Sequence, residues 1–103
     1  NKWGDFVKPS VDAGAKALNG IELDENLAGT NPNPEAEGAY PIATLTWILA
    51  YETGNGKNTE AIKTSLSTLL SDEYQDKAPK LGFVPLKGEI LEKARSAVDK
   101  IGK

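Results

Sequence analysis

The sequence predicts an α/β fold built around one long strand and three to four helices. Residues 40–52 (YPIATLTWILAYE) are rich in β-branched and aromatic side chains, and both alternating faces of this segment are largely apolar. That pattern is typical of a central strand that is covered on both sides. Apolar residues at helical spacing occur before and after this segment, which places helices on either side of the strand in the chain.

The composition excludes most catalytic and metal chemistry. The chain has 103 residues, of which 39% are hydrophobic and 26% charged, which is ordinary globular usage. It contains no cysteine and no histidine, so thiolate nucleophiles, imidazole acid–base catalysis and the commonest zinc ligands are absent. A net charge of −3 disfavours binding to phosphate backbones. We therefore expect a protein that is not an enzyme, with no cofactor, no metal and no nucleic-acid partner.

The chain begins at Asn1 and contains no methionine. Such a chain has either lost its initiator methionine to processing or been cut from a longer protein, and we expect the second. No run of residues approaches the roughly 18 consecutive apolar residues that a membrane-spanning helix needs.

In the first part of the chain, Ser10 is a candidate N-cap for a helix over residues 11–18. Val11, Ala15 and Leu18 would form its apolar face, and Asn19–Gly20 would end it in a left-handed conformation. Residues 29–38 (GTNPNPEAEG) are rich in turn formers and predict an exposed loop.

The long strand over residues 40–52 would be about twice the usual strand length. Such a strand either crosses between two lobes or bends partway, and Pro41 near its start suits a bend. The chain offers at most two other short strand candidates, whereas three or more strands are usually needed for independent stability. The sequence therefore indicates a segment of a larger α/β protein.

The second part of the chain predicts helices in close succession. Residues 53–58 form a turn, and a helix capped by Asn58 or Thr59 follows. Ser71 is a candidate cap for a further helical stretch through Leu81, which Gly82 would stop. After a short extended piece at residues 83–86, an amphipathic helix starts near Lys87. The apolar stripes of the first and last of these helices comprise Ile62, Leu66, Leu69 and Leu70, and Ile90, Leu91, Ala94, Val98 and Ile101.

Two loops have some of the residues of an ion site, and in both the spacing argues against one. The turn Gly54–Lys57 precedes a helix, as phosphate-binding loops do, but the first glycine of that motif falls on Tyr51 and Asn58 follows the lysine. A solvated turn explains these residues better. The stretch from Asp24 to Glu35 has carboxylates at the ends of a calcium-loop spacing, but a non-ligating side chain and two prolines interrupt it.

Four other side chains are candidates for ligand contacts. Arg95 is the only arginine, and we expect it to form surface ion pairs on the last helix. Trp3, Trp47 and Tyr51 are candidates for a stacking platform, but aromatic residues on a strand buried on both faces are more often part of the core. We expect these three to be core residues.

Four stretches together resemble a known family. These are NKWGDFVKPSVDAGAKAL at residues 1–18, GAYPIATLTWILAYET at 38–53, SDEYQDKAPKLGFVPL at 71–86 and GEILEKARSAVDKI at 88–101. In this order they resemble the C-terminal part of the phosphate-binding protein of bacterial phosphate ABC transporters, and they are most similar to cyanobacterial members.

The resemblance implies part of a two-lobed periplasmic-binding-protein fold of type 2, with the ligand in the cleft between lobes. Residues 1–39 would end the second lobe, residues 40–52 would be the crossover strand and hinge, and residues 53–103 would be helices completing the first lobe. Tyr40, Pro41 and Ile42 are the hinge candidates. The Arg-x-x-x-Ser-Gly-Thr stretch by which the family holds phosphate is absent here, so we assign no phosphate ligand to this chain.

The resemblance also implies a setting for the whole protein. That protein would be a periplasmic monomer, with or without a lipid anchor, that binds inorganic phosphate through its other parts and delivers it to an ABC transporter permease. The alternative is a self-contained small α/β interaction module. Either way, the isolated chain could form a swapped or edge-paired dimer through its long strand.

Overall fold

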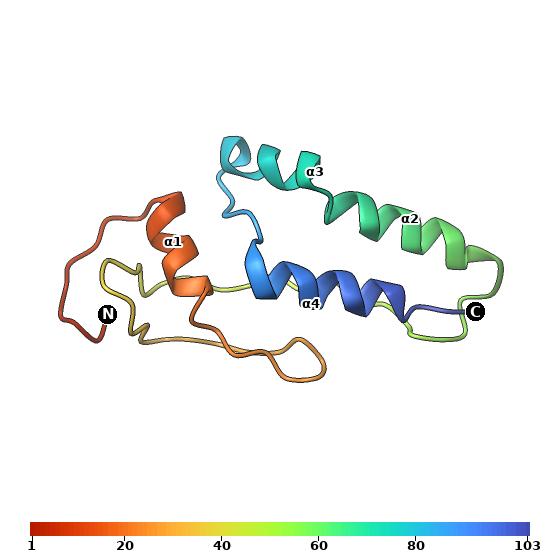
Figure 1. The fold of residues 1–103 in the computed structure, drawn as a ribbon, viewed down its shortest axis with the longest axis horizontal. Helices are drawn as coiled ribbons and strands as arrows, with labels where there is room; N and C mark the ends of the chain where they lie inside the picture. The colour runs from red at the N-terminus through yellow and green to blue at the C-terminus, as the bar shows by residue number, and fades with distance from the viewer.

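The computed structural model describes all residues 1–103, and its regular structure consists of helices alone. Helices α2 and α3 follow one another along one side of the molecule, α4 runs antiparallel beside α2, and α1 lies at the opposite end (Figure 1). The elements in chain order are α1 (Val11–Leu18), the 3-10 turn η1 (Gly56–Asn58), α2 (Thr59–Leu69), α3 (Asp72–Lys77), the 3-10 turn η2 (Ala78–Leu81) and α4 (Gly88–Asp99).

Two predicted helix starts and one predicted stop are confirmed. The Ser10 hydroxyl accepts a hydrogen bond from the Ala13 amide at 3.1 Å, and the Ser71 hydroxyl accepts one from the Tyr74 amide at 3.4 Å. Gly82 ends the helical stretch with a φ of 83°, a left-handed conformation that glycine adopts at little energetic cost because it has no Cβ. The hydroxyls of Ser10 and Ser71 satisfy amides that a helix leaves free in its first turn.

Helix α1 differs from the prediction at its end and on its buried face. Asn19 has a φ of −62°, so the predicted left-handed stop is wrong, and its amide donates to the Ala15 carbonyl instead. The buried residues of α1 are Ala13, Gly14, Ala17 and Leu18. Small side chains dominate this face because other segments come close: a Cβ at Gly14 would lie 2.8 Å from Cγ2 of Val84.

The predicted α/β fold and crossover strand are wrong. Residues 40–52 are extended but form no strand, and no backbone–backbone hydrogen bond involves residues 41–51. The physical reason is that a strand needs a partner to complete its ladder, and no other segment of this chain takes that position. High β propensity therefore produces an extended segment without a sheet.

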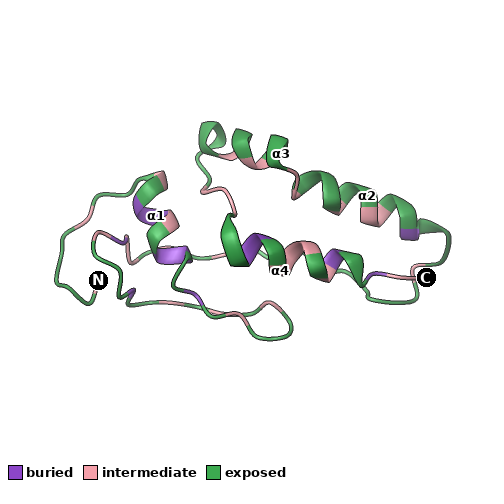
Figure 2. Cartoon of the chain, viewed as in Figure 1, coloured by how far each residue is buried: buried purple, intermediate pink, exposed green.

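The core is small and lies where α1 and α4 meet the extended chain. Twelve of the 103 residues are buried (Figure 2). Leu18, Ile21 and Ile90 form the central cluster, and the partly buried side chains packed against it are Leu23, Ala43, Leu45, Val84 and Leu86. The apolar stripe predicted for the last helix is confirmed at its buried positions, Ile90, Leu91, Val98 and Ile101.

The molecule is elongated, with principal extents of 51 × 28 × 17 Å. Its radius of gyration is 15.3 Å. A compact domain of this length would have a radius of gyration of about 13 Å. The larger radius of gyration agrees with the small core, because a chain that buries few side chains is less compact. None of the helices has both the length and the apolar content needed to cross a membrane.

Candidate functional site

The hinge candidates lie where an anchored loop passes into the extended segment. The Tyr40 amide donates to the Ala13 carbonyl of α1 at 3.0 Å, and the buried Ala39 carbonyl accepts a hydrogen bond from the Asn1 side chain at 3.2 Å. The chain then bends at Pro41 and Ile42, and Ile42 is exposed. A fixed residue is thus followed directly by residues whose dihedral angles can change without breaking a backbone hydrogen bond.

The extended segment beyond the bend has two different halves. At residues 41–45 exposure alternates, with Ala43 and Leu45 turned to the core, whereas residues 46–54 are all exposed. The indole N–H of Trp47 donates to the Leu27 carbonyl at 2.7 Å, which holds the second half against the loop that follows α1.

The turn after this segment binds its own chain. The Asn55 side-chain amide donates to the carbonyls of Tyr51 and Gly102, both at 2.9 Å, and the Gly102 amide donates to the Glu52 carbonyl at 2.7 Å. The Thr59 hydroxyl donates to the Gly56 carbonyl at 2.7 Å. The predicted turn at residues 53–58 is confirmed, and the side chains of Asn55 and Thr59 are committed to carbonyl oxygens. Asn55 was missed from the sequence because Gly102 lies 47 residues away.

Arg95 joins three helices. Its guanidinium donates to the Leu70 carbonyl at 2.8 and 3.2 Å and pairs with Asp72 at 3.1 Å and Glu92 at 3.3 Å. Two carboxylates and a carbonyl therefore surround the one side chain suited to bidentate anion binding.

The acidic residues of the loop from 24 to 35 lie in separate surroundings. The Asp24 carboxylate accepts hydrogen bonds from the amides of Asn26 at 2.8 Å and Ala28 at 3.0 Å, which closes a local turn. Glu35 pairs with Lys2, whose hydrogen bond and positive charge hold the pKa of the Glu35 carboxyl below its ordinary value of 4.5. The two carboxylates have different partners and do not belong to a group that could hold a metal ion.

The three aromatic candidates are not core residues, so that expectation is wrong. Trp3 and Tyr51 are 66% and 80% exposed, and Trp47 is 43% exposed. Trp3 donates its indole N–H to the Glu35 carbonyl at 2.6 Å, whereas Trp47 contacts the Leu27 carbonyl. The two indoles are thus fixed on different loops and share no bonding partner.

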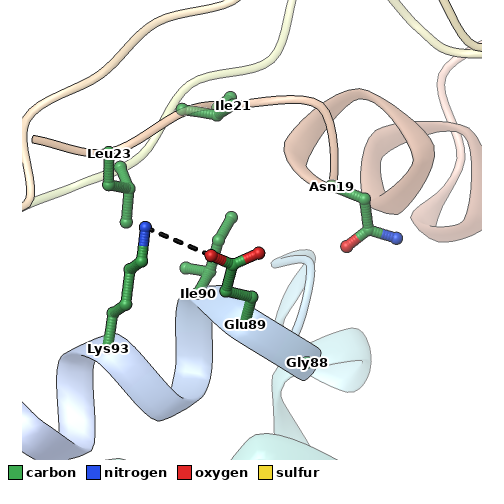
Figure 3. A pocket seen from close by; sticks show the side chains of 7 residues that line it. All are labelled: Asn19, Ile21, Leu23, Gly88, Glu89, Ile90 and Lys93. Atoms are coloured by element: carbon green, nitrogen blue, oxygen red, sulfur yellow. Dashed lines mark ion pairs between the residues drawn. The ribbon is translucent and has the colours of Figure 1, made fainter.

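A hollow of about 300 Å³ lies between the end of α1 and the start of α4 (Figure 3). On its α4 wall, the ammonium of Lys93 lies 3.3 Å from the carboxylate of Glu89, so the cation is already paired. The carboxylate would repel an anion, and the other walls are mainly apolar. Its lining residues are Asn19, Ile21, Leu23, Gly88, Glu89, Ile90 and Lys93.

Taken together, these surfaces offer anchored loops and an extended connection, and Lys2, Lys93 and Arg95 each pair with an acidic side chain. The chain is 28% identical, over 115 aligned positions, to the phosphate-binding protein PstS of Methanocaldococcus jannaschii. The alignment covers 98% of this chain and 29% of that relative, so the chain spans less than a third of the relative's length. No protein-family profile matches the chain. The similarity supports a distant relationship to phosphate-binding proteins.

Proposed function

We propose that this chain is a structural and hinge segment of a phosphate-binding protein, and that it is not an enzyme. The observation that carries the proposal is the similarity to PstS, which extends over 98% of the chain. On this proposal the whole protein works in the periplasm and delivers phosphate to the permease of an ABC importer. The likeness to cyanobacterial members stays a prediction.

The contacts around residues 39–42 support the hinge assignment. The Tyr40 amide is bonded to α1, while Pro41 and the ten residues after it make no backbone–backbone hydrogen bond. Motion between two lobes requires a few residues that absorb large dihedral changes. Tyr40, Pro41 and Ile42 lie at the boundary between the anchored and the free backbone, as such residues should.

The surroundings of Arg95 and Asn55 support the absence of a phosphate ligand. Phosphate is usually held by amides, hydroxyls and a bidentate arginine. Arg95 is occupied by Asp72, Glu92 and the Leu70 carbonyl, and Asn55 in the glycine-rich turn is occupied by two carbonyls. The phosphate ligands are therefore expected in other parts of the protein.

A chimera tests the proposal directly. The segment of the M. jannaschii relative that matches this chain is replaced by the chain, and phosphate binding is measured by calorimetry. We expect the chimera to bind phosphate and the relative without the segment not to bind it. A folded chimera that fails to bind, or a deletion that binds as well as the intact protein, would overturn the proposal.

A second measurement concerns the ligands. Amide NMR spectra of the isolated chain are recorded without and with millimolar phosphate, and sulfate at equal ionic strength is the control. We expect the two anions to give the same small, unsaturable shifts. Saturable shifts at residues 54–59 with phosphate alone would show that the glycine-rich turn is a phosphate site after all.

A further inference from the structure

Trp47 fixes the middle of the extended segment to another part of the chain. Its indole N–H donates to the Leu27 carbonyl at 2.7 Å, and this is the one side-chain hydrogen bond made by residues 46–50. Trp47 is 43% exposed, against 64% for Ile48 and 95% for Leu49. The indole is therefore the point at which this part of the segment is held.

The acceptor of this hydrogen bond has an unusual backbone conformation. Leu27 has a φ of 64°, and it is the one non-glycine residue of the chain with a positive φ. A residue with a Cβ adopts this left-handed conformation at a cost, because the Cβ comes close to the following carbonyl oxygen. Such strain persists where surrounding contacts determine the conformation, and it occurs mainly at clamps and switch regions.

Asp24 supplies the contacts that determine the conformation of Leu27. Its carboxylate accepts hydrogen bonds from the amides of Asn26 and Ala28. On the backbone, the Leu27 amide donates to the Asp24 carbonyl at 3.0 Å, and the Asp24 amide donates to the Ala28 carbonyl at 2.9 Å. None of these four hydrogen bonds involves Trp47, so the loop holds the Leu27 carbonyl in place without help from the indole.

The two arms of this loop are also tied together and to the core. A Cβ at Gly29 would overlap with the carbonyl oxygen of Glu22 and would lie 2.9 Å from Cγ2 of Ile21. The absence of a Cβ at Gly29 therefore allows the close approach of the two arms. Ile21 belongs to the central cluster. The Leu27 carbonyl is thus carried by a closed loop that begins at a core residue.

We propose that the Trp47 indole and the Leu27 carbonyl form a latch that keeps bending of the extended segment at residues 41–42. On one side of these two residues, the Tyr40 amide is bonded to α1, and on the other side the latch joins Trp47 to the core-bound loop. When the latch is open, the chain beyond residue 46 turns as well. Trp47 is accordingly a positioning residue for the hinge. This inference rests on the hinge function proposed above.

Exchange of the indole N–H protons with water, measured by NMR in the intact chain, tests the latch. Trp3 is an internal control, because its indole donates to the Glu35 carbonyl instead. Asp24→Ala removes the carboxylate that holds the loop, and we expect it to speed the exchange of the Trp47 indole proton about three- to tenfold. Glu25→Ala removes an exposed carboxylate of the same loop and should change neither indole proton.

Trp47→Phe tests whether the loop is formed without the indole. The amides of Leu27 and Ala28 are bonded to Asp24, so their exchange should be the same in this variant as in the wild type. Faster exchange of these two amides would overturn the proposal that the acceptor is formed in advance. Unchanged exchange of the Trp47 indole proton in Asp24→Ala would overturn the latch, and so would equal acceleration at both tryptophans.

The role of the latch in the hinge is tested in the chimera described above. Trp47→Phe keeps an aromatic ring but removes the donor, so the free chimera samples more conformations and loses more entropy on binding. We expect phosphate binding to weaken about threefold or more, whereas Trp3→Phe should leave it unchanged. Equal affinities in the two variants and the unmodified chimera would overturn the positioning role of Trp47. An unmodified chimera that binds no phosphate would overturn the proposed function, while indole exchange would still decide whether the latch exists.

Discussion

The guanidinium of Arg95 in α4 lies 3.1 Å from the carboxylate of Asp72, the first residue of α3. The same guanidinium donates two hydrogen bonds to the carbonyl of Leu70, the residue that caps the end of α2. One side chain thus binds the end of one helix and the beginning of the next from a third. Arg95 therefore links α2, α3 and α4.

Replacing Arg95 with alanine should destabilise the helical half of the chain. The Leu70 carbonyl loses both donors and the two exposed ion pairs with Asp72 and Glu92 are lost, so we expect the free energy of unfolding to fall by about 1–2 kcal/mol. Urea denaturation followed by circular dichroism measures the change.

Lys93→Ala is the control for Arg95→Ala. Lys93 pairs with Glu89 of the same helix at an exposed position, so its removal should cost at most about 0.5 kcal/mol. Equal losses of stability in the two variants would contradict a special role for Arg95.

Asn55→Ala should loosen the attachment of Gly102, which follows α4, to the turn before α2. The variant leaves the carbonyls of Tyr51 and Gly102 without their shared donor, which should cost about 1 kcal/mol. Hydrogen exchange at the Gly102 amide, which is bonded to the Glu52 carbonyl, should become faster. Asn26→Ala on an exposed loop is the control, and it should leave this amide unchanged.

Gly14 and Val84 should show strong coupling in a double-mutant cycle. Alanine in place of a helical glycine usually adds about 1 kcal/mol of stability. At Gly14 we expect that gain to be absent, because the new Cβ would lie 2.8 Å from Cγ2 of Val84. In a Val84→Ala background the gain should return. Thermal unfolding of the wild type, the two single variants and the double variant measures the coupling. Strictly additive changes in stability would disprove the close contact.

Lys2→Gln should raise the pKa of Glu35. In the wild type, the Lys2 hydrogen bond and charge lower this pKa below 4.5. A carboxyl whose folded pKa is lowered stabilises the fold above its ordinary pKa, and this contribution is lost as the pH falls through the lowered value. Carbon-13 NMR of the side-chain carboxyl follows the titration. Lys77→Gln, which removes a lysine paired with Glu73 elsewhere in the molecule, should leave the Glu35 curve in place.

Local signals in the sequence predicted the helices. The absence of a sheet and the contacts between distant parts of the chain depend on non-local pairing. Ser10, Ser71 and Gly82 act within a few residues of themselves, so their roles could be assigned from sequence order. The sheet could not be assigned in that way, because the fate of residues 40–52 depends on whether another segment supplies a ladder. The contacts of Asn55 with Gly102 and of Arg95 with Leu70 likewise join residues 47 and 25 positions apart.

The exposed backbone at residues 46–54 also has a consequence for proteolysis. Chymotrypsin cleaves after large apolar and aromatic side chains, and this stretch offers it several on backbone that makes no hydrogen bond to other backbone groups up to residue 51. A single cut here separates a piece containing α1 from a piece containing α2, α3 and α4. The cluster that would then join them brings Leu18 and Ile21 from one piece and Ile90 from the other, with Val84 and Leu86 of the second piece packed against it. After such a cut, this small cluster and the side chains around it would have to hold the two ends of the molecule together.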